Sequence, residues 1–387
     1  MSRTDPSIFE LPVEKIRSGY YSDQYFNLTK ELLESDEHLP TVVMQCFQRE
    51  QSLAGGVDEA IAILKLCSGE LGPKWHPEDI GPGPKAYRQR LLDEKGWKNG
   101  WDQLEVKALN EGDPIEPWEP VLQITGPYHL FAHLETVILG VMARRSLVMR
   151  NVKEALDAAN GKPLWFFPAR HDHWVVQTGD GLAAHQAGVQ GVSTDAGASW
   201  WGGRGMGTIP HALIAAYGGD TVLAARKFAD RYADEMNVTV LVDFENDSVL
   251  TALAVARELG DKLWGVRLDT SGNLVDRSLT HHTEYGSFNP LGVNPELVRL
   301  VRDALDRQGH EHVKIIASGG FKAEKIRQFE SLGVPVDAYG VGSSLIRGSN
   351  DYTADIVRLH QPIGDHWKNV GKVGRWFRDD SRLEVVT

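Results

Sequence analysis

The chain has 387 residues, a formal net charge of -12, 42% hydrophobic residues and 24% charged residues. This composition is typical of a folded globular protein, and the length favours two domains or a barrel with an extra layer. The negative charge argues against nucleic acid or an anionic membrane as a partner, because both require a basic face. Cys46 and Cys67 lack disulfide or metal-ligand spacing, and no signal-like apolar stretch begins the chain, so we expect a cytoplasmic protein.

Residues 1–128 are expected to form a smaller α+β domain. A helix is predicted within residues 24–34, a strand at 41–47 and a second helix at 57–66. From 105 to 128, short β runs alternate with four prolines. Proline cannot donate to a sheet ladder, so this segment is predicted to form edge strands and turns.

A barrel domain is predicted over residues 129–350. A long helix over 129–159 leads into it, because apolar residues recur there at helical spacing. Seven strands are then predicted, at 163–167, 186–192, 207–209, 239–244, 263–268, 314–318 and 338–342. The fold class is therefore α/β, an incomplete parallel α/β barrel of about seven strands beside the smaller domain. Residues 351–387 contain no barrel unit and are expected to pack on the first domain.

Four of the predicted strands stop abruptly in polar or glycine-rich tips. They lie in segments 238–247, 263–273, 313–321 and 336–345. Each is followed by predicted helix, so the repeated unit is a buried parallel strand, a loop and a helix. In α/β barrels the active site lies at the carboxyl ends of the strands, which makes these tips the candidate site.

The last two tips predict a phosphate site. Missing side chains let backbone N–H groups approach a ligand, and serine hydroxyls add donors. Glycines that serve only as turn residues with a positive φ are the alternative for either tip alone, whereas two such tips in succession favour phosphate. The residues are Ser318, Gly319, Gly320, Gly340, Gly342, Ser343 and Ser344.

The other two tips carry charged side chains. Arg267 and Asp269 lie two residues apart and share a face, and Asp243 has the matching place on the preceding strand. Asp243 and Asp269 could accept from ribose hydroxyls, and Asp247 could help hold a hydrated Mg2+. A structural salt bridge at the barrel rim is the alternative.

Two further positions have side chains suited to chemistry. Arg170 ends the run WFFPAR and could grip a carboxylate or phosphate, with a surface ion pair as the alternative. His211 follows Thr208 in GTIPHA and opens an apolar helix. His211 is either a nucleophile or acid/base group, or a helix-start histidine with a satisfied hydrogen bond, and its local sequence alone favours the second.

Taken in order, these motifs resemble those of the nicotinate phosphoribosyltransferases, within the group that includes nicotinamide and quinolinate phosphoribosyltransferases. The resemblance runs from SDQYFNLT through EGDPIEPWEPVLQITGPY, LWFFPAR, GTIPHA, LVDFEND, VRLDTSGN and IIASGGF to YGVGSS. It implies transfer of the phosphoribosyl group of 5-phosphoribosyl 1-pyrophosphate to nicotinate, giving nicotinate mononucleotide for NAD synthesis. It also implies Mg2+, and ATP as a co-substrate.

The resemblance implies roles at the strand tips. The two glycine loops would hold the 5-phosphate, with Thr208 in the same binding set. Asp243 and Asp269 would bind the ribose hydroxyls, and Arg170 and Arg267 would meet the nicotinate or pyrophosphate charges. Where relatives often carry a second arginine, Arg170 is followed by histidine, a departure that bears on recognition of the acid.

The resemblance also implies covalent chemistry and a partner subunit. His211 matches the histidine that is phosphorylated from ATP in the family, and a neutral imidazole nitrogen is a suitable nucleophile. Tyr25 would stack on the pyridine ring bound by a second subunit, with Tyr21 as the alternative if the spacing shifts. A homodimer with shared active sites follows.

Other functions remain as alternatives. A nicotinamide-specific enzyme would need a carboxylate to accept from the amide, but residues 191–194 offer none before Asp195, so nicotinate is favoured. Quinolinate, a diacid, calls for more Arg and Lys than these tips carry. A different class is a barrel lyase, for which Lys314 lies at the wrong end of its strand, or a non-catalytic sensor of phosphoribosyl ligands.

Overall fold

A computed structural model describes residues 3–71, 96–280, 282 and 286–386. The chain divides into a first unit, Met1–Arg150 with Gly348–Thr387, and a barrel unit, Asn151–Arg347. The division falls within helix α5 (Glu135–Ala158) and not at residue 128. None of the described helices is both long and apolar enough to cross a membrane.

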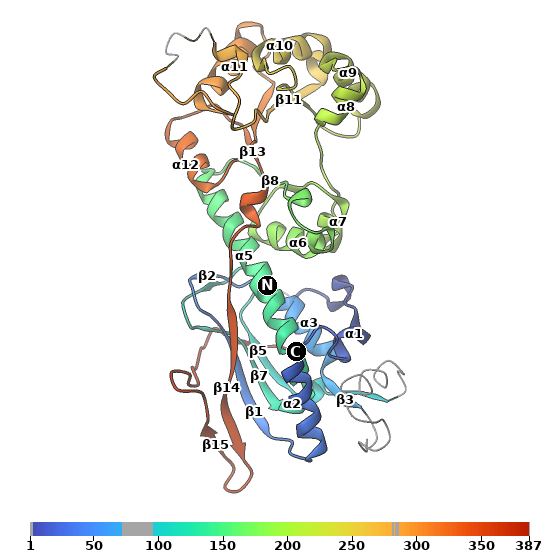
Figure 1. Cartoon of the computed structure of the whole chain (residues 1–387), viewed down its shortest axis with the longest axis vertical. Coiled ribbons are helices and arrows are strands. Elements are labelled where there is room, and N and C mark those ends of the chain that lie inside the picture. Colours follow the sequence, from blue (N-terminus) through green and yellow to red (C-terminus); the bar gives the residue numbers. More distant parts are fainter. Residues whose placement is uncertain (1–2, 72–95, 281, 283–285, 387) are drawn as a thin grey trace. The chain divides into compact units, whose positions relative to one another are not determined.

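An antiparallel six-stranded sheet forms the centre of the first unit, in the order β15-β14-β1-β7-β5-β16. In Figure 1 the red strand β14 runs beside the blue strand β1, so the end of the chain completes a sheet begun near its start. The strands are β1 (Thr41–Gln48), β5 (Glu105–Ala108), β7 (Pro120–Pro127), β14 (Tyr352–Gln361), β15 (His366–Asn369) and β16 (Glu384–Val385).

Strand β7 lies in the middle of this sheet, so the prediction of an edge strand was wrong for it. Its two prolines, Pro120 and Pro127, are the first and last residues of the strand, where a missing N–H costs little ladder bonding. The pairing with β1 shifts register between Cys46 and Phe47, next to Pro120. The apolar residues between the prolines are buried, which places β7 in the core.

The helices of the first unit agree closely with the sequence. The predicted helices are confirmed as α2 (Gln24–Ser35) and α3 (Val57–Cys67), which accompany α1 (Val13–Arg17). The predicted long helix begins later than expected, because residues 128–134 form two 3-10 turns before α5. Two short ribbons complete the unit, β2 (Ser52–Leu53) with β6 (Pro114–Ile115) and β3 (Gly69–Leu71) with β4 (Trp97–Asn99).

The barrel unit contains a parallel six-stranded sheet in the order β10-β11-β12-β13-β8-β9, which confirms the predicted α/β class. Its strands bury β-branched residues, and Val240, Val266 and Ile315 are completely buried. The strands are β8 (Leu164–Phe166), β9 (Gly191–Val192), β10 (Val238–Leu241), β11 (Leu263–Leu268), β12 (Lys314–Ala317) and β13 (Ala338–Val341).

The seventh predicted strand, at residues 207–209, is reduced to a single parallel bridge between Ile209 and Val240 of β10. Just before it, the Met206 N–H donates to the Val192 carbonyl of β9 (2.8 Å). Segment 206–209 is therefore hydrogen-bonded to both edge strands of the sheet. This arrangement supports an incomplete barrel that one short segment brings close to closure.

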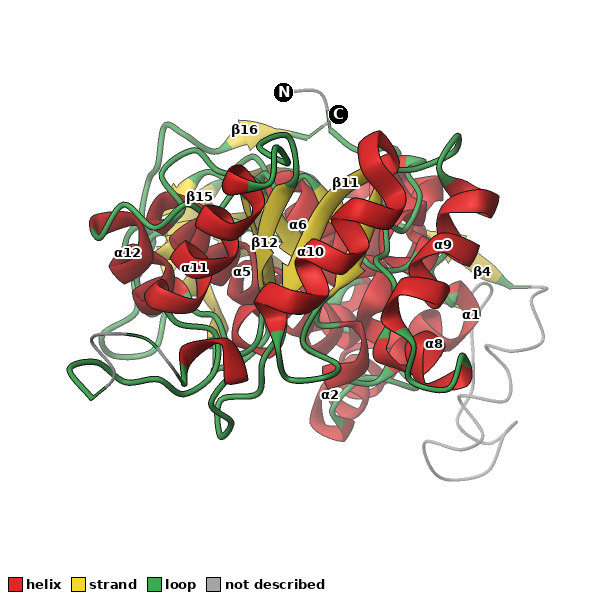
Figure 2. Ribbon diagram, turned by 90° about the horizontal axis from the view of Figure 1, so that it is seen from above, coloured by secondary structure: helices red, strands yellow, loops and turns green. Residues whose placement is uncertain are grey.

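Helices follow the strands of the barrel unit, and four of those described begin with a side-chain cap, which at α7 is Thr194. Asp220, Asp247 and Asn294 accept from backbone N–H groups at the starts of α9, α10 and α11. Seen from above, α10 lies across β11 and β12, outside the sheet (Figure 2). The helices are α6 (Gln177–Ala187), α7 (Asp195–Ala198), α8 (His211–Ala216), α9 (Thr221–Tyr232), α10 (Ser248–Leu259), α11 (Pro295–Arg307) and α12 (Ala323–Ser331).

The strand predicted at residues 186–192 was mostly wrong. Helix α6 continues to Ala187 and ends at Gly188, which has a φ of 109°. Only glycine adopts this conformation readily, so Gly188 is a helix C-terminal signal rather than part of a strand. Two residues, Gly191 and Val192, are left to form β9.

Candidate active site

The centre of the candidate site is a network around Arg267, near the carboxyl end of β11. The guanidinium donates from Nε to Ser318 Oγ (2.8 Å), from Nη1 to Thr208 Oγ1 (3.1 Å) and from Nη2 to Asp269 Oδ2 (3.1 Å). Ser318 Oγ lies 2.8 Å from Asp269 Oδ1 and can donate to it. Three of the five guanidinium N–H donors are thus used within the network, which leaves two for a ligand.

The network brings together four of the predicted residues, from the tips of β11 and β12 and from segment 206–209. Arg267 and Asp269 have side chains that are 19% and 22% exposed, so the pair is neither fully solvated nor sealed from a ligand. Ser318 is 2% exposed, and its hydroxyl is used by Arg267 and Asp269. The Ser318 side chain therefore orients the charged pair and is not free for a ligand.

A second pair joins His211 and Asp243. His211 is the first residue of α8, and its Nε2 lies 3.0 Å from Asp243 Oδ1, just beyond β10. The hydrogen bond with Asp243 raises the pKa of His211, and the charges of Asp243 and Asp269 add to this, while burial and Arg267 oppose it. The histidine thus lies within the electrostatic reach of the Arg267 network.

The two glycine loops lie next to each other. Gly319 and Gly320 have φ values of 82° and 72°, two successive left-handed residues that only glycine tolerates readily. Ser344 Oγ donates to the Phe321 carbonyl (2.9 Å), which ties the loop after β13 to the loop after β12. The backbone of both loops can therefore face one ligand.

The tip of β8 lies against the loop after β13. Phe167 N–H donates to the Val341 carbonyl (2.8 Å), and a side chain at Gly342 would come within 2.9 Å of His171 Cε1. Arg170 is exposed in the 3-10 turn Ala169–His171. Burial and the charges of Arg170 and Arg347 lower the pKa of His171, so the imidazole is next to two cationic groups.

Gly340 and Ser343 complete the predicted phosphate set. Gly340 is buried in β13, and a Cβ there would come within 3.0 Å of the Phe167 ring. A small residue is therefore required for β13 to pack beside the β8 tip. Ser343 is half-buried at the start of the 3-10 turn Ser343–Leu345, where it follows Gly342.

Asp247 was predicted to help hold Mg2+, but its carboxylate serves the protein itself. It accepts from the Leu250 N–H (3.4 Å) at the start of α10 and from Ser278 Oγ (3.0 Å). Across residues 3–71, 96–280, 282 and 286–386, no three His, Cys, Asp or Glu side chains gather to form a metal site. The described residues therefore do not form a protein cage for a metal.

Tyr25 and Tyr21 belong to the first unit. Tyr25 is in α2 and is 60% exposed, and Tyr21 is 44% exposed. Tyr25 Oη donates to Asp23 Oδ2 (3.2 Å), and its ring packs on Phe26 with centroids 4.3 Å apart. Both tyrosines thus present an aromatic face to solvent.

Two residues at the site were missed from the sequence. The Arg267 guanidinium lies over the Phe167 ring, with Cζ 5.4 Å from the centroid. His171 packs against Gly342 in the loop after β13. The sequence offered only their positions as an indication, because Phe167 ends a predicted strand and His171 follows Arg170. A lone aromatic or histidine at a strand end has too many structural roles to be singled out.

The arrangement can bind anions and polarised hydroxyls at one edge of the sheet. Arg267 and the loop amides offer donors, and Asp243 and Asp269 offer acceptors. Such a site suits a phosphorylated sugar held for attack by a second substrate.

Comparisons with known proteins agree with the predicted resemblance. Residues 98–146 match the family described as quinolinate phosphoribosyl transferase, N-terminal domain. Nicotinate phosphoribosyltransferase pncB1 of Mycobacterium tuberculosis is 30% identical over 258 residues, 65% of this chain and 52% of that protein. A nicotinate phosphoribosyltransferase of Bacillus subtilis is 25% identical over 242 residues, 62% of this chain and 45% of that protein. The chain thus matches about half the length of these curated relatives.

Solved structures give the same fold. A nicotinate-nucleotide pyrophosphorylase from Pyrococcus furiosus aligns with a TM-score of 0.74 and 28% identity, covering 100% of this chain and 86% of that one. Human nicotinic acid phosphoribosyltransferase aligns with a TM-score of 0.56 and 17% identity, covering 86% and 74% of the two chains, which supports the fold alone. The resemblance to the type II phosphoribosyltransferase group is confirmed.

Proposed function

Because the chain is a homologue of the nicotinate phosphoribosyltransferases, we propose that it transfers the phosphoribosyl group of 5-phosphoribosyl 1-pyrophosphate to nicotinate. The products are nicotinate mononucleotide and pyrophosphate, and the reaction serves NAD synthesis. The observation that carries the proposal is the Arg267–Asp269–Ser318 network, which lies between two glycine loops at the carboxyl ends of parallel strands. It supplies donors for anions beside acceptors for sugar hydroxyls.

In this reaction the ring nitrogen of nicotinate attacks the anomeric carbon while the bond from that carbon to the pyrophosphate oxygen breaks. Positive charge develops on the ribose, so nearby carboxylates stabilise the transition state. Asp243 and Asp269 are suited to hold the ribose hydroxyls, and the two unused Arg267 N–H groups are suited to the leaving group. No protein nucleophile needs to attack the sugar.

Mg2+ is proposed to arrive with the pyrophosphate. Mg2+ usually keeps several waters and is often bound by substrate phosphates with one or two carboxylates. This mode of binding is compatible with the described residues, among which no three metal-binding side chains gather. The ion would neutralise charge on the leaving group, and the residues named above orient the sugar.

We further propose that ATP phosphorylates His211. The Asp243 carboxylate can only accept, so in the neutral ring the proton lies on Nε2 and Nδ1 keeps its lone pair. Nδ1 would then attack the γ-phosphorus of ATP, forming an N–P bond as the bond to the ADP oxygen breaks. Hydrolysis of the phosphohistidine returns phosphate and links ATP consumption to the transfer.

A homodimer with shared sites is proposed on the exposure of Tyr25. An aromatic side chain that is 60% exposed on a helix has a free face for a planar ring from outside its own unit. In a dimer, Tyr25 of one subunit would cover the pyridine ring bound at the strand tips of the other.

Quinolinate is the second candidate acceptor, because residues 98–146 match the N-terminal domain of that family. The described tips carry Arg267, already bonded to a carboxylate, and Arg170, which suits one acid group better than two. The test is to incubate the protein and 5-phosphoribosyl 1-pyrophosphate with nicotinate, nicotinamide or quinolinate in turn. We expect nicotinate mononucleotide and pyrophosphate from nicotinate, and carbon dioxide release from quinolinate would favour the second candidate. Absence of pyrophosphate with all three would refute the proposal.

A further inference from the structure

A cavity of about 590 Å³ lies in the barrel unit between α11, α12 and the segment that precedes α11. It is lined by residues near the starts of both helices, by Gln328, Phe329 and Leu332 further along α12, and by Phe288 and Leu291 before α11. None of the described residues that line it belongs to the Arg267 network, to the His211–Asp243 pair or to the two glycine loops. The cavity is therefore distinct from the candidate active site.

Large apolar side chains surround the opening of this cavity. Leu291 and Leu332 both line it, and they are 43% and 50% exposed. The rings of Phe288 and Phe329 contribute further apolar surface. Apolar side chains that remain in contact with water around one cavity favour a ligand with an apolar body, because covering them removes that surface from water.

The cavity wall also contains a half-buried cation, Lys325, in the first turn of α12. Its Nζ lies 4.3 Å from the ring centroid of Phe321 and 5.7 Å from that of Phe329. The two rings pack edge to face, with centroids 4.9 Å apart. The ammonium group is thus held against an aromatic pair, which fixes its position in the wall.

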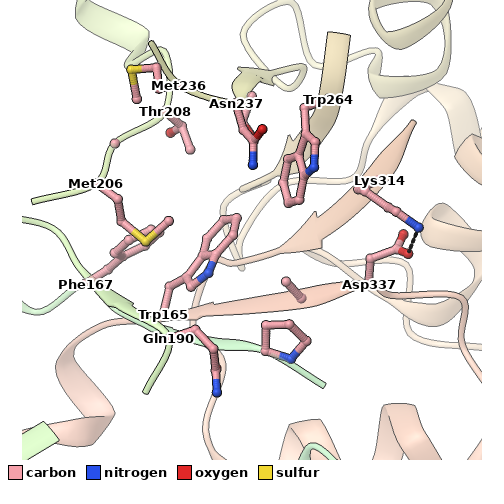
Figure 3. A pocket seen from close by; sticks show the side chains of 14 residues that line it. Trp165, Phe167, Gln190, Met206, Thr208, Met236, Asn237, Trp264, Lys314 and Asp337 are labelled. Atoms are coloured by element: carbon pink, nitrogen blue, oxygen red, sulfur yellow. Dashed lines mark ion pairs between the residues drawn. The ribbon is translucent and has the colours of Figure 1, made fainter. Parts of the chain in front are cut away.

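Lys325 differs from other lysines of the barrel unit in the charges around it. Lys314 lies 3.1 Å from Asp337, a pair that Figure 3 shows, and Lys162 lies 2.7 Å from Glu330. Across the part of the chain that the structure describes, no carboxylate forms an ion pair with Lys325, and burial lowers its pKa to about 8. A partly buried cation without an opposite charge is unfavourable, so an anionic ligand would stabilise it.

The other charges of the lining favour a ligand with a single negative charge. The two glutamates that line the cavity are already paired, Glu296 with Arg299 (3.3 Å) and Glu324 with Lys322 (3.6 Å). Lys325 is left as one unmatched positive charge beside them. A monoanion would balance this charge, whereas a dianion would also be repelled by the two glutamates.

We propose that this cavity is a binding site for a small apolar monocarboxylate, whose carboxylate is bound by Lys325 and whose apolar body packs on Phe329, Leu291 and Leu332. The site is additional to the proposed reaction and lies apart from the strand tips that would hold its substrates.

The binding test compares three probes that share one apolar body and differ in charge. They are naphthalene-2-carboxylate, naphthalene-2-carboxamide and 2-naphthyl phosphate, each titrated into the protein by calorimetry. The carboxylate should bind roughly tenfold more tightly than the uncharged carboxamide, the equivalent of one hydrogen bond between charged groups. It should also bind more tightly than the phosphate, which carries the second negative charge.

Substitutions separate the role of the charge from that of the apolar wall. Lys325→Met keeps the length of the side chain and should weaken carboxylate binding roughly tenfold without changing carboxamide binding. Lys322→Met is the matched control on the same helix, because the Lys322 side chain is 63% exposed and already paired, and its loss should cost about twofold at most. Leu332→Ser should weaken both probes alike, about fivefold.

Proton uptake tests the charge in the native protein. Because the pKa of Lys325 is lowered to about 8, roughly half of its side chains are uncharged at pH 8, and a bound carboxylate favours the charged form. Binding at pH 8 should therefore take up about half a proton per molecule, measured by titration in buffers with different heats of ionisation. Lys325→Met should take up none.

Five results would overturn the inference. They are no binding of the carboxylate, equal binding of carboxylate and carboxamide, tighter binding of the phosphate, binding at pH 8 without proton uptake, or equal losses in Lys325→Met and Lys322→Met. Competitive displacement of the carboxylate by 5-phosphoribosyl 1-pyrophosphate would also overturn it, since the cavity would then be part of the strand-tip site. All of these measurements are made without turnover, so they are separate from the success or failure of the proposed reaction.

Discussion

Replacing Asp243 by asparagine should change which nitrogen of His211 carries the proton. In the native pair the Asp243 carboxylate accepts from Nε2 at 3.0 Å, which leaves Nδ1 as the nucleophile. Asparagine keeps the shape but can turn its amide NH2 toward the ring. Nε2 then becomes the acceptor, and the proton moves to Nδ1. The nitrogen proposed to attack ATP would thereby lose its lone pair.

The expected loss of ATP hydrolysis follows from the energy of that hydrogen bond. Hydrogen bonds to charged groups contribute about 1.5–3 kcal/mol, which corresponds to a rate decrease of roughly 10- to 100-fold. The measurement is release of ADP with nicotinate and 5-phosphoribosyl 1-pyrophosphate present. Asp220→Asn is the matched control, because Asp220 only caps α9 and asparagine is an equally good cap. Its ADP release should stay at the native rate.

The same substitution should alter the pH dependence of stability. The hydrogen bond with Asp243 raises the pKa of His211 above its ordinary value of 6.5. A raised folded-state pKa stabilises the protein fully below the unfolded value, and the contribution is lost as pH rises through the folded value. The His211 side chain is 44% exposed, so solvent screening limits the gain to about 1 kcal/mol or less. Asp243→Asn should therefore be destabilised at pH 5.5 and match the native protein at pH 9.

Titration of the His211 ring by NMR provides the direct check. The pKa of His211 should fall in Asp243→Asn and stay at the native value in Asp220→Asn. If Asp243→Asn releases ADP at the native rate and its His211 pKa is unchanged, then the pair neither fixes the tautomer nor supports phosphorylation, and the reasoning is refuted.

Three further predictions concern separate parts of the chain. Gly342→Ala should raise the KM for 5-phosphoribosyl 1-pyrophosphate about fivefold, because the new Cβ would come within 2.9 Å of His171 Cε1 and displace the ring. An unchanged KM would count against a phosphate role for this loop. Mixing inactive Tyr25→Ala and Arg267→Ala subunits should restore about a quarter of native activity in a dimer with shared sites, and no recovery would argue against sharing. The Cys67 thiol, whose pKa burial raises to about 12, should react with a thiol reagent only on unfolding, and rapid reaction of the native protein would contradict its burial.

The parallel strands of the barrel unit were predictable because their sequences carry the signal locally. The segment Leu263–Leu268 is mainly apolar and is followed by a polar tip, and its strand lies where expected. Strand β9 was not predictable, since two residues carry no periodicity and Gly188 ends a helix instead. The sheet of the first unit depends on pairing β1 with β14, segments far apart in sequence, so no local pattern could have indicated it.

The sequence indicated which residues come together at the candidate site better than it indicated the hydrogen bonds between them. The period of two placed Arg267 and Asp269 on one face, and the structure joins them at 3.1 Å. The sequence could not indicate that Ser318 turns inward to Arg267 instead of toward a ligand, because a hydroxyl after a strand serves either purpose. It likewise could not indicate that Asp247 caps α10, because a helix cap and a metal ligand call for the same side chain.

Segment 206–209 contacts both edges of the parallel sheet and Arg267. It is joined to the two sheet edges by the hydrogen bond from Met206 to Val192 and by the bridge of Ile209 to β10. Thr208 lies between them and accepts from Arg267, while His211 begins two residues further on. A ligand that moved the Arg267 guanidinium would act directly on Thr208, and through it on the segment that joins the two sheet edges.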